Sequence, residues 1–478
     1  MIQALQLILA LCFIVLTHEL GHFAFARLFK VRVEKFYLFF NPWFTLFRAK
    51  KINGQWRFKF FTKNGEEDEW GQHPETTEWG LGWLPLGGYC AIAGMVDETH
   101  SSEDLGSEPQ EWEFRSKPAW QRMLIILGGI LVNFIEGIII FICLVWHFGT
   151  DTLPLRNADK GLYYSQMMLD EGFQQHDKII AINGEEPQVL GDIINALVVE
   201  GKRDVIVLRG ADTVQLQVSE DFGNRYLAMM NDFDRIEREK HRADKNYQKQ
   251  SYILVEEWIP FVLDSIVPEH AAYYGGLEKG DSIVAVGGEE TPSAYQVKQA
   301  LRMWVCDSVR IDYFRAGDLH TTTLFIGDQG QMGVIIRSKY QYFPIEHTDY
   351  TFFEAVPAGI RNGWQVIASY VKQFRLVFSK EGAQSMGGFI AIGNIFPNMW
   401  SWYAFWHITA FLSLVLAFMN FLPIPALDGG YILFLLVEMI TRRKPSDKFL
   451  EIANQIGFWL LLALLLFANG NDLLKLFF

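Results

Sequence analysis

The N-terminal segment of the chain, from Ile2 to Phe29, is apolar over most of its length and yet contains His18, Glu19 and His22. A run of about 20 apolar residues is long enough to cross a bilayer as a helix. The segment is longer than the core of a signal peptide, and it lacks the basic start and the small-residue cleavage site of such a peptide. Because a charged group at the centre of a membrane span costs about 2.5 to 3.5 kcal/mol, the three polar side chains must face a partner or a cavity.

These three residues form the pattern HExxH. Residues i and i+4 lie on one face of a helix, so His18 and His22 can present their imidazoles to one point. Glu19 lies about 100° further round the helix, where its carboxylate can hold a water on a metal bound by the two histidines. The alternative is a pair of core histidines with other partners, and hydrocarbon offers few of these. A catalytic zinc site also needs a third protein ligand and an open fourth position.

Composition indicates a protein that is partly embedded in a membrane. The chain has 478 residues, of which 50% are hydrophobic and 15% aromatic, and its mean hydropathy is +0.09. These values predict a mixed architecture of membrane spans and water-exposed parts. The net charge of -13, without a basic block, argues against nucleic acid as a partner. The cysteines at positions 12, 90, 143 and 306 have no CxxC spacing and are interpreted as packing residues.

Three further apolar segments predict three further membrane spans, at residues 122–149, 404–440 and 454–478. Four spans place both termini on the same side of the membrane. Basic residues gather on cytoplasmic flanks. Here they follow the first span, precede the second and follow the third: Arg27, Lys30, Arg32, Lys35, Arg115, Lys117, Arg122, Arg442, Arg443 and Lys444. We therefore expect the termini and the region between the second and third spans to lie outside the cytoplasm.

The region between the second and third spans contains a repeat. The stretches GFQQHDKIIAINGEEP, from Gly172, and GLEKGDSIVAVGGEET, from Gly276, align without gaps. Each has a glycine-led turn, an aspartate, an alternating apolar strand and a second glycine turn, which predicts two copies of one α/β module. The copies resemble the PDZ domain in its circularly permuted bacterial form, which binds extended peptides by strand addition. The alternative is a pair of spacers without ligands, above all for the first copy.

Two segments near these copies have distinct patterns. The charged stretch 234–250 is expected to be a solvated linker or insertion between the copies. From Ile360 to Phe378, apolar residues recur at intervals of three and four, which predicts an amphipathic helix at the membrane interface. An ordinary helix of the outer domain remains the alternative.

The third span contains the sequence MNFLPIPALDGGY, in which Pro423 and Pro425 must interrupt the helix. Irregular backbone at membrane depth is tolerated only where it is buried in protein or lines a wet cavity. Asp428 is therefore the natural third zinc ligand, with Asn420 close enough to orient a substrate. The alternative for Asp428 is a helix cap at the membrane edge.

With both motifs in view, the chain resembles the site-2 protease family of intramembrane zinc metalloproteases, specifically the bacterial regulator-of-sigma-E protease type. The resemblance rests on HELGH, WLPLGGYCAIAG, a span containing Gly-Gly, the PDZ-like repeats and NFLPIPALDGG. It implies that His18, His22 and Asp428 bind Zn²⁺ and that Glu19 is the catalytic base. Glu136 in the second span, Phe389 and the lengthened segment 50–82 depart from the family pattern.

The resemblance also implies residues that bind the substrate. Asn420 is a polar group of the substrate site, and Asn133 of the second span is expected to contribute to it. In the family, LPLGGY belongs to a β-hairpin that dips into the membrane and presents an edge to the substrate. Gly87, Gly88 and Tyr89 occupy these positions here. A substrate helix must be unwound before hydrolysis, and such an edge offers its freed backbone groups new partners.

The expected fold is a polytopic α-helical membrane protein of four spans with a membrane-associated β-hairpin and two extracytoplasmic PDZ-like α/β domains in tandem. Its expected parts, in order, are span 1 with HExxH (1–30), a cytoplasmic-side segment with the re-entrant hairpin (31–121), span 2 (122–149), PDZ-like domain 1 (150–250), PDZ-like domain 2 (251–345), an amphipathic helix with a gate-like segment (352–400), span 3 with the LDG motif (404–440) and span 4 (454–478).

The expected function is intramembrane proteolysis in the bacterial inner membrane. The substrates implied by the resemblance are single-span proteins, such as anti-sigma factors already trimmed by an upstream outer-side protease, or remnant signal peptides. Substrate, upstream protease and membrane lipids are the expected partners, and nucleic acid is not. The competing hypothesis is a non-catalytic membrane scaffold that displays PDZ domains, which gives HExxH and a distant aspartate no purpose.

Overall fold

The structure is a computed structural model, and it describes residues 2–63, 70, 73, 75–85, 87–95, 108–243, 252–328, 330–374, 379, 382 and 386–477. The chain forms two compact units. Unit 1 contains the residues up to Gly149 and most of residues 349–476, and unit 2 contains residues 150–348 together with a few residues from later in the chain.

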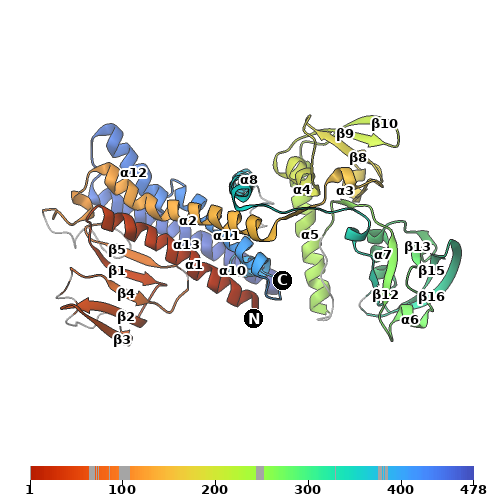
Figure 1. The fold of residues 1–478 in the computed structure, drawn as a ribbon, viewed down its shortest axis with the longest axis horizontal. Coiled ribbons are helices and arrows are strands. Elements are labelled where there is room, and N and C mark those ends of the chain that lie inside the picture. Colours follow the sequence, from red (N-terminus) through yellow and green to blue (C-terminus); the bar gives the residue numbers. More distant parts are fainter. Residues whose placement is uncertain are drawn as a thin grey trace. The chain divides into compact units, whose positions relative to one another are not determined.

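Among the described residues of unit 1, four helices are long and apolar enough to cross a membrane (Figure 1). They are α1 (Ile2–Leu28), α2 (Ala119–Phe148), α11 (Trp402–Phe421) and α13 (Asp447–Phe477). The prediction of four long apolar helices is therefore confirmed. The remaining helices are α8 (Phe352–Phe374), most of which belongs to this unit, α10 (Phe389–Ile395) and α12 (Asp428–Thr441).

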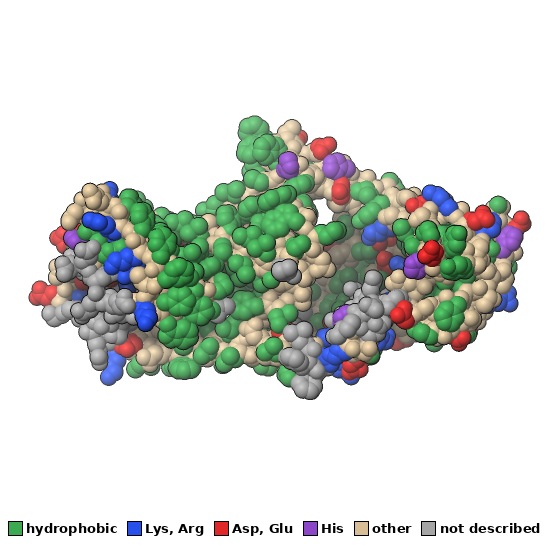
Figure 2. All heavy atoms as spheres, turned by 90° about the horizontal axis from the view of Figure 1, so that it is seen from below, with side chains coloured by type: hydrophobic (Ala, Val, Ile, Leu, Met, Phe, Trp, Pro, Cys, Tyr) green, Lys and Arg blue, Asp and Glu red, His purple; other side chains and the backbone are tan. Residues whose placement is uncertain are grey.

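Glycines bring the helices of unit 1 close together. At the crossing of α1 and α2, a Cβ added to Gly21 would lie 2.4 Å from the carbonyl oxygen of Gly128, so the two backbones are in direct contact. Small residues permit this approach between helices in a membrane. Hydrophobic side chains gather over a broad part of the face shown in Figure 2. On α13, Trp459 and Leu466 are examples of large exposed hydrophobic residues, as expected for a surface in contact with lipid.

The third predicted span is interrupted, as its prolines indicate. Helix α11 ends at Phe421 and α12 begins at Asp428. The segment between them contains Pro423 and Pro425, which have no backbone N–H to donate to a helix. Ala426 has a φ of 71°, in the left-handed region. The break thus places Asp428 in the first turn of a new helix.

Unit 1 also contains a five-stranded sheet in the order β3-β2-β4-β1-β5. Its strands are β1 (Val33–Leu38), β2 (Phe44–Ile52), β3 (Gln55–Lys63), β4 (Glu78–Leu81) and β5 (Tyr89–Ile92). Strands β2 and β3 form a hairpin closed by Asn53 and Gly54, both with positive φ, which is typical of a two-residue turn. Strand β1 is parallel to β4 and antiparallel to β5.

The expected β-hairpin at LPLGGY is not formed as predicted. This segment connects β4 to β5, and β1 lies between these two strands, so they do not pair with each other. The residues that follow β1 bond to the segment instead: the N–H of Phe40 donates to the carbonyl of Leu84, and the reverse bond is also present. A Cβ at Gly82 would lie 2.2 Å from the carbonyl oxygen of Phe40, so the crossing requires glycine. The strand between β4 and β5 is formed by residues 33–38. From the sequence, these residues are identified only as part of the basic flank of the first span.

Unit 2 contains two sets of elements that follow one another in the same order. The first set is β7 (Leu162–Tyr164), α3 (Gln166–Leu169), β8 (Lys178–Ile182), α4 (Leu190–Ile194), β9 (Asp204–Arg209), β10 (Asp212–Gln217) and, after α5 (Phe222–Ala243), β11 (Val255–Glu257). The second set is β12 (Phe261–Ile266), α6 (Ala271–Tyr274), β13 (Ser282–Val286), β14 (Glu289–Glu290), α7 (Ala294–Leu301), β15 (Asp307–Arg315), β16 (Asp318–Ile326) and β17 (Val334–Ile336). Each set encloses its own hydrophobic cluster.

The strands of the two sets pair in related ways. The first set forms a sheet β10-β9-β8 and a pair β11-β7, and the second forms one sheet in the order β16-β15-β13-β12-β17, with β14 paired to β13. At the start and end of unit 2, β6 (Thr150–Thr152) pairs with β18 (Glu346–Thr348) in an antiparallel ribbon. Helix α5 has no counterpart in the second set, and it continues through much of the expected linker, up to Ala243; residues 244–250 lie outside the described residues.

The aspartate of the repeat has a structural role in both sets. The side chain of Asp281 is fully buried and accepts two hydrogen bonds from the guanidinium of Arg315, at 2.8 and 2.7 Å. Arg315 also donates to the carbonyl of Gly276 at 2.8 Å. Asp177 and Arg209 form the same bidentate pair in the first set, at 2.9 and 2.8 Å. The repeated motif thus fastens the glycine turn to a neighbouring strand.

We predict that Arg315→Ala destabilises unit 2 by about 2–4 kcal/mol, because it leaves the buried Asp281 carboxylate without its cationic partner. This value is below that of a fully buried pair because Arg315 is partly exposed to water. The control is Arg310→Ala on the same strand, where the arginine is 61% exposed and pairs with Asp312. Asp312 is only 14% exposed but also accepts a hydrogen bond from Thr321, so it keeps a partner when Arg310 is removed. Because water screens the exposed guanidinium, its loss should cost less than about 1 kcal/mol. The two variants are compared, as full chains, by the urea concentration at which unit 2 becomes sensitive to protease. Equal sensitivity would contradict the assigned role of Asp281.

Candidate metal centre

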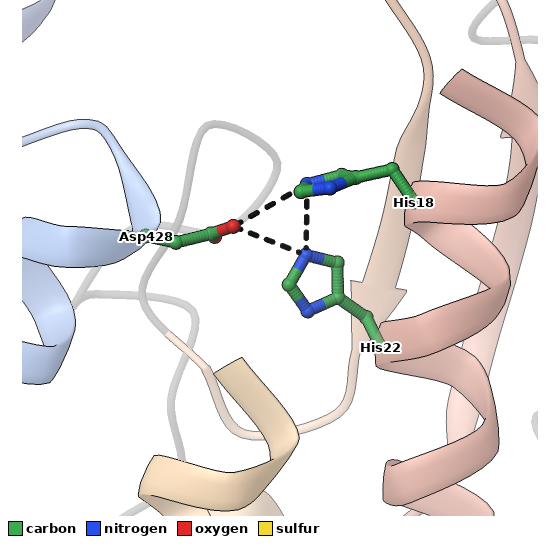
Figure 3. Close-up of side chains that lie close together, drawn as sticks. All are labelled: His18, His22 and Asp428. Carbon is green, nitrogen blue, oxygen red and sulfur yellow. Dashed lines mark hydrogen bonds and ion pairs between the residues drawn. The ribbon is translucent and has the colours of Figure 1, made fainter. Parts of the chain in front are cut away.

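The two histidines of HExxH and the aspartate of the third predicted span meet at one point (Figure 3). His18 and His22 lie one turn apart on α1, and Asp428 opens α12. Nε2 of His18 lies 3.2 Å from Nε2 of His22, and Oδ2 of Asp428 lies 3.3 Å from the former and 3.5 Å from the latter. Both histidines are buried. The sequence separates Asp428 from them by some 400 positions, and the structure brings all three together as predicted.

The spacing of these three atoms fits a zinc ion. In a tetrahedral zinc site with bonds of about 2.0–2.1 Å, neighbouring ligand atoms lie about 3.3–3.4 Å apart. The three measured separations bracket that value. Oδ2 of Asp428 is buried and accepts no hydrogen bond from the described residues, so it has capacity for a cation. Two neutral imidazoles and one carboxylate are a donor set that zinc prefers, and they leave a fourth position open.

The tautomer of His22 is fixed by a backbone carbonyl. Nδ1 of His22 lies 3.0 Å from the carbonyl oxygen of Ile125 on α2. A carbonyl oxygen can only accept, so Nδ1 carries the proton and Nε2 keeps the lone pair that a metal requires. Hydrogen bonds of this kind orient the ring and are a common feature of metal-binding histidines.

Two asparagines contact His18. The amide nitrogen of Asn133, fully buried on α2, lies 3.3 Å from Nδ1 of His18. The amide nitrogen of Asn420, near the end of α11, lies 3.4 Å from Nε2 of the same ring. The backbone carbonyl of Asn133 accepts a hydrogen bond from Ser413 at 2.9 Å, which ties α2 to α11 at this level. Both asparagines predicted from the sequence are therefore at the centre, and Asn133 lies at the ring nitrogen that faces away from Asp428.

A glycine on α2 makes room for the two imidazoles. A Cβ added to Gly129 would lie 2.5 Å from Nε2 of His22 and 2.7 Å from Cε1 of His18. No side chain fits there without displacing the rings. The sequence showed this glycine only as part of a Gly-Gly pair in a predicted span, and its contact with the histidines was not foreseen.

Glu19 lies next to His18 on α1 and is half-buried. Its neighbour from the sheet is Gly88, which precedes β5: a Cβ at Gly88 would lie 3.4 Å from Cγ of Glu19 and 2.9 Å from the side chain of Val15. The start of β5 thus runs directly beside α1 at the level of HExxH. Tyr89 points elsewhere, with its ring stacked on Tyr37 at a centroid separation of 5.0 Å.

Two further contacts near the centre were not predicted. Gly87 has a φ of 152° and lies against the ring of Phe40, so it shapes the turn before β5. Glu136, the unexpected acid of the second span, pairs with the hydroxyl of Thr17 on α1 at 2.5 Å. This contact gives the Glu136 carboxyl group a partner among the apolar helices. The partner, Thr17, directly precedes His18.

Comparison with known proteins identifies the family. Residues 6–65 and 69–464 match peptidase family M50. The chain belongs to peptidase family M50. It is thus a zinc metalloprotease, and the predicted enzyme class, the zinc cofactor and the resemblance to the regulator-of-sigma-E type are confirmed at this level. The scaffold hypothesis without catalysis is set aside.

Relatives align with the enzyme from end to end. Two proteins named "Putative zinc metalloprotease", from Ralstonia nicotianae and Treponema pallidum, are 24% and 26% identical over 500 residues, covering 100% of this chain and 99% and 100% of their own length. The regulator of sigma E protease of Haemophilus influenzae is 26% identical over 483 residues, covering 98% of each chain.

We predict that Gly129→Ala weakens zinc binding by about tenfold or more, because the added methyl group displaces the rings of His18 and His22. The matched control is Gly137→Ala on the same helix, where the methyl group would meet the side chain of Leu414, away from the histidines. Zinc retained by the purified variants in a competing chelator measures the effect. Equal zinc retention by the two variants would contradict the close contact at Gly129.

Proposed function

We propose that His18, His22 and Asp428 hold the zinc ion and that Glu19 is the catalytic base of an intramembrane protease. The observation that carries the proposal is the mutual separation of the three donor atoms, 3.2 to 3.5 Å, inside helices apolar enough to cross a membrane. Polar groups at such a depth are kept where they have a function or a partner.

The bound zinc would supply Lewis-acid polarisation of the scissile carbonyl and would lower the pKa of a water toward about 7. Glu19 takes the proton of the attacking water on its carboxylate and later gives it to the leaving amine. His22 and Ile125 keep the ring nitrogen that faces the metal deprotonated. Asn133 is fully buried beside Nδ1 of His18. With its amide oxygen turned toward this nitrogen, it would accept the Nδ1 proton and leave Nε2 for the metal. Its predicted contact with substrate stays a prediction. Asn420, whose amide nitrogen lies 3.4 Å from Nε2 of His18, is proposed to hold the substrate.

The edge strand β5 is proposed to receive the unwound substrate. Among the described strands, β5 pairs with β1 and lies at the end of the sheet. Strand addition is proposed at this end. Gly88, at the start of this strand, lies beside Glu19. Gly87 and Tyr89 flank it and would shape the edge. In the described residues β4 and β5 do not pair, yet the segment that connects them reaches the level of the metal centre at Gly88.

We propose that the substrates are single-span membrane proteins, such as anti-sigma factors trimmed by an upstream outer-side protease, or remnant signal peptides. Full-length similarity to a regulator of sigma E protease supports the first class. Comparing the membrane peptides of cells that contain the active enzyme or its Glu19→Gln variant would test both. Absence of any peptide difference would remove this substrate class.

The two sets of elements in unit 2 are proposed to be the PDZ-like domains 150–250 and 251–345. Strand β17 lies at an edge of its sheet, with Ile335 exposed, and is the strand to which a peptide would add. The segment 352–400, with α8 as its amphipathic helix, is proposed as a gate; residues 375–378 of the expected helix lie outside the described residues. The backbone of Val334 faces away from β12, because Gly333 and Arg337 bond to that strand. Binding of labelled peptides to the enzyme and to a Val334→Pro variant would test the peptide role.

We predict that Glu19→Gln lowers cleavage of a model membrane substrate by at least about 100-fold and leaves bound zinc unchanged, because it removes the base and keeps all three ligands. Asp428→Asn should lower both cleavage and bound zinc. Substrate cleavage and metal content are measured on the same preparations. Near-normal turnover by Glu19→Gln would refute the catalytic assignment.

We also propose that the protein lies in the inner membrane with unit 2 outside the cytoplasm, as the basic flanks indicate. Cysteines introduced near Asp234 and at Asn471, in a background without native cysteines, should react with an impermeant thiol reagent added to intact spheroplasts. A cysteine at Lys444 should not react until the membrane is opened. The reverse labelling would place unit 2 in the cytoplasm.

A further inference from the structure

Helix α13 buries few of its residues and yet places one polar side chain against the broken segment. Only 6% of the residues in its most apolar stretch are buried. Asn454, near its start, is half-buried and makes hydrogen bonds to the segment that carries Asp428. A polar side chain in a helix of this kind is costly unless it has a partner in the protein. Its contacts therefore show what holds α13 to the rest of unit 1 at this level.

The two hydrogen bonds of Asn454 lie on either side of Asp428. Its amide nitrogen donates to the hydroxyl of Tyr431 on α12, at 2.7 Å. Its amide oxygen accepts from the backbone N–H of Ala426 at 3.4 Å, a longer contact. Ala426 precedes Asp428 by two residues and Tyr431 follows it by three. A single side chain thus connects the end of the break to the first turn of α12.

The backbone of the break supports the same role. Ala426 adopts a φ of 71°, a conformation that residues with a side chain rarely take up and that persists only where the surroundings hold it. One turn after Asn454, a Cβ at Gly457 would lie 1.9 Å from the carbonyl oxygen of Pro425. Residues three apart share a face of the helix. Asn454 and Gly457 therefore form one surface of α13 that fits the break.

We propose that Asn454 is a positioning residue for the metal centre: by holding Ala426 and Tyr431, it fixes the point at which α12 presents the Asp428 carboxylate to the histidines. Asn454 touches neither metal nor substrate in this arrangement. It acts through the backbone on either side of the ligand. The inference rests on the proposed function, because it requires His18, His22 and Asp428 to bind the metal.

The test uses the full chain in detergent, loaded with Co²⁺ in place of zinc. The visible spectrum of Co²⁺ reports the geometry of its ligands, and the rate of its release to a chelator reports how firmly they hold it. In Asn454→Leu both hydrogen bonds are lost, and we expect release to be faster by on the order of tenfold, with an altered spectrum. Tyr431→Phe removes one oxygen atom and should show a smaller change in the same direction. The double variant should release Co²⁺ no faster than Asn454→Leu, since both changes remove the same bond.

The matched control is Gln455→Leu, a similar loss of an amide on the next residue of α13, where the side chain is exposed. Its spectrum and release rate should equal those of the unmodified enzyme. If Asn454→Leu does not accumulate in the membrane, the Co²⁺ spectrum and release rate of Tyr431→Phe decide the test, because this variant keeps the packing of the ring. Unchanged spectra and release rates in these variants would overturn the inference and leave the proposed function standing. Equal Co²⁺ binding by the unmodified enzyme and His22→Ala would overturn the proposed function and this inference with it.

Discussion

The cost of placing two histidines and an aspartate inside apolar helices governs the architecture of unit 1. That cost is offset where the donor atoms of the three side chains converge. Convergence requires α1 and α12 to meet at one level, with α2 packed against the histidine rings. Gly21 and Gly128 let α1 and α2 touch, Gly129 leaves space for the rings, and the prolines stop α11 so that α12 can begin with Asp428. The glycines and the break are thus consequences of one electrostatic requirement.

Much of the metal centre could be predicted because its signals are local. The i, i+4 spacing of His18 and His22 places them on one face whatever surrounds the helix, and paired prolines must break a span. The contacts of Gly129, of the Ile125 carbonyl and of Asn454 could not be predicted in this way. These contacts depend on which helices are neighbours and on how far each is shifted along its axis relative to the next. The spacing of residues within a single helix does not contain that information.

The sheet of unit 1 shows the same limit. The glycines of LPLGGY indicated a turn, and a turn between two strand-like stretches suggested a hairpin. The pairing was decided instead by β1, which lies some 50 positions earlier and has both of its edges occupied, by β4 and by β5. In unit 2 the sequence repeat predicted the recurring elements, because each copy encloses its own core, while the partners of Asp177 and Asp281 became visible only in the folded chain.

The ribbon of β6 and β18 has a consequence for how such a protein can change over time. Thr150 is paired with Thr348, so the segment 150–348, which forms most of unit 2, begins and ends at adjacent points, about 5 Å apart as in any antiparallel pair. The separation of these two points does not depend on what lies between them. An insertion between these two points, such as α5, therefore leaves the spacing of the ends of this segment unchanged.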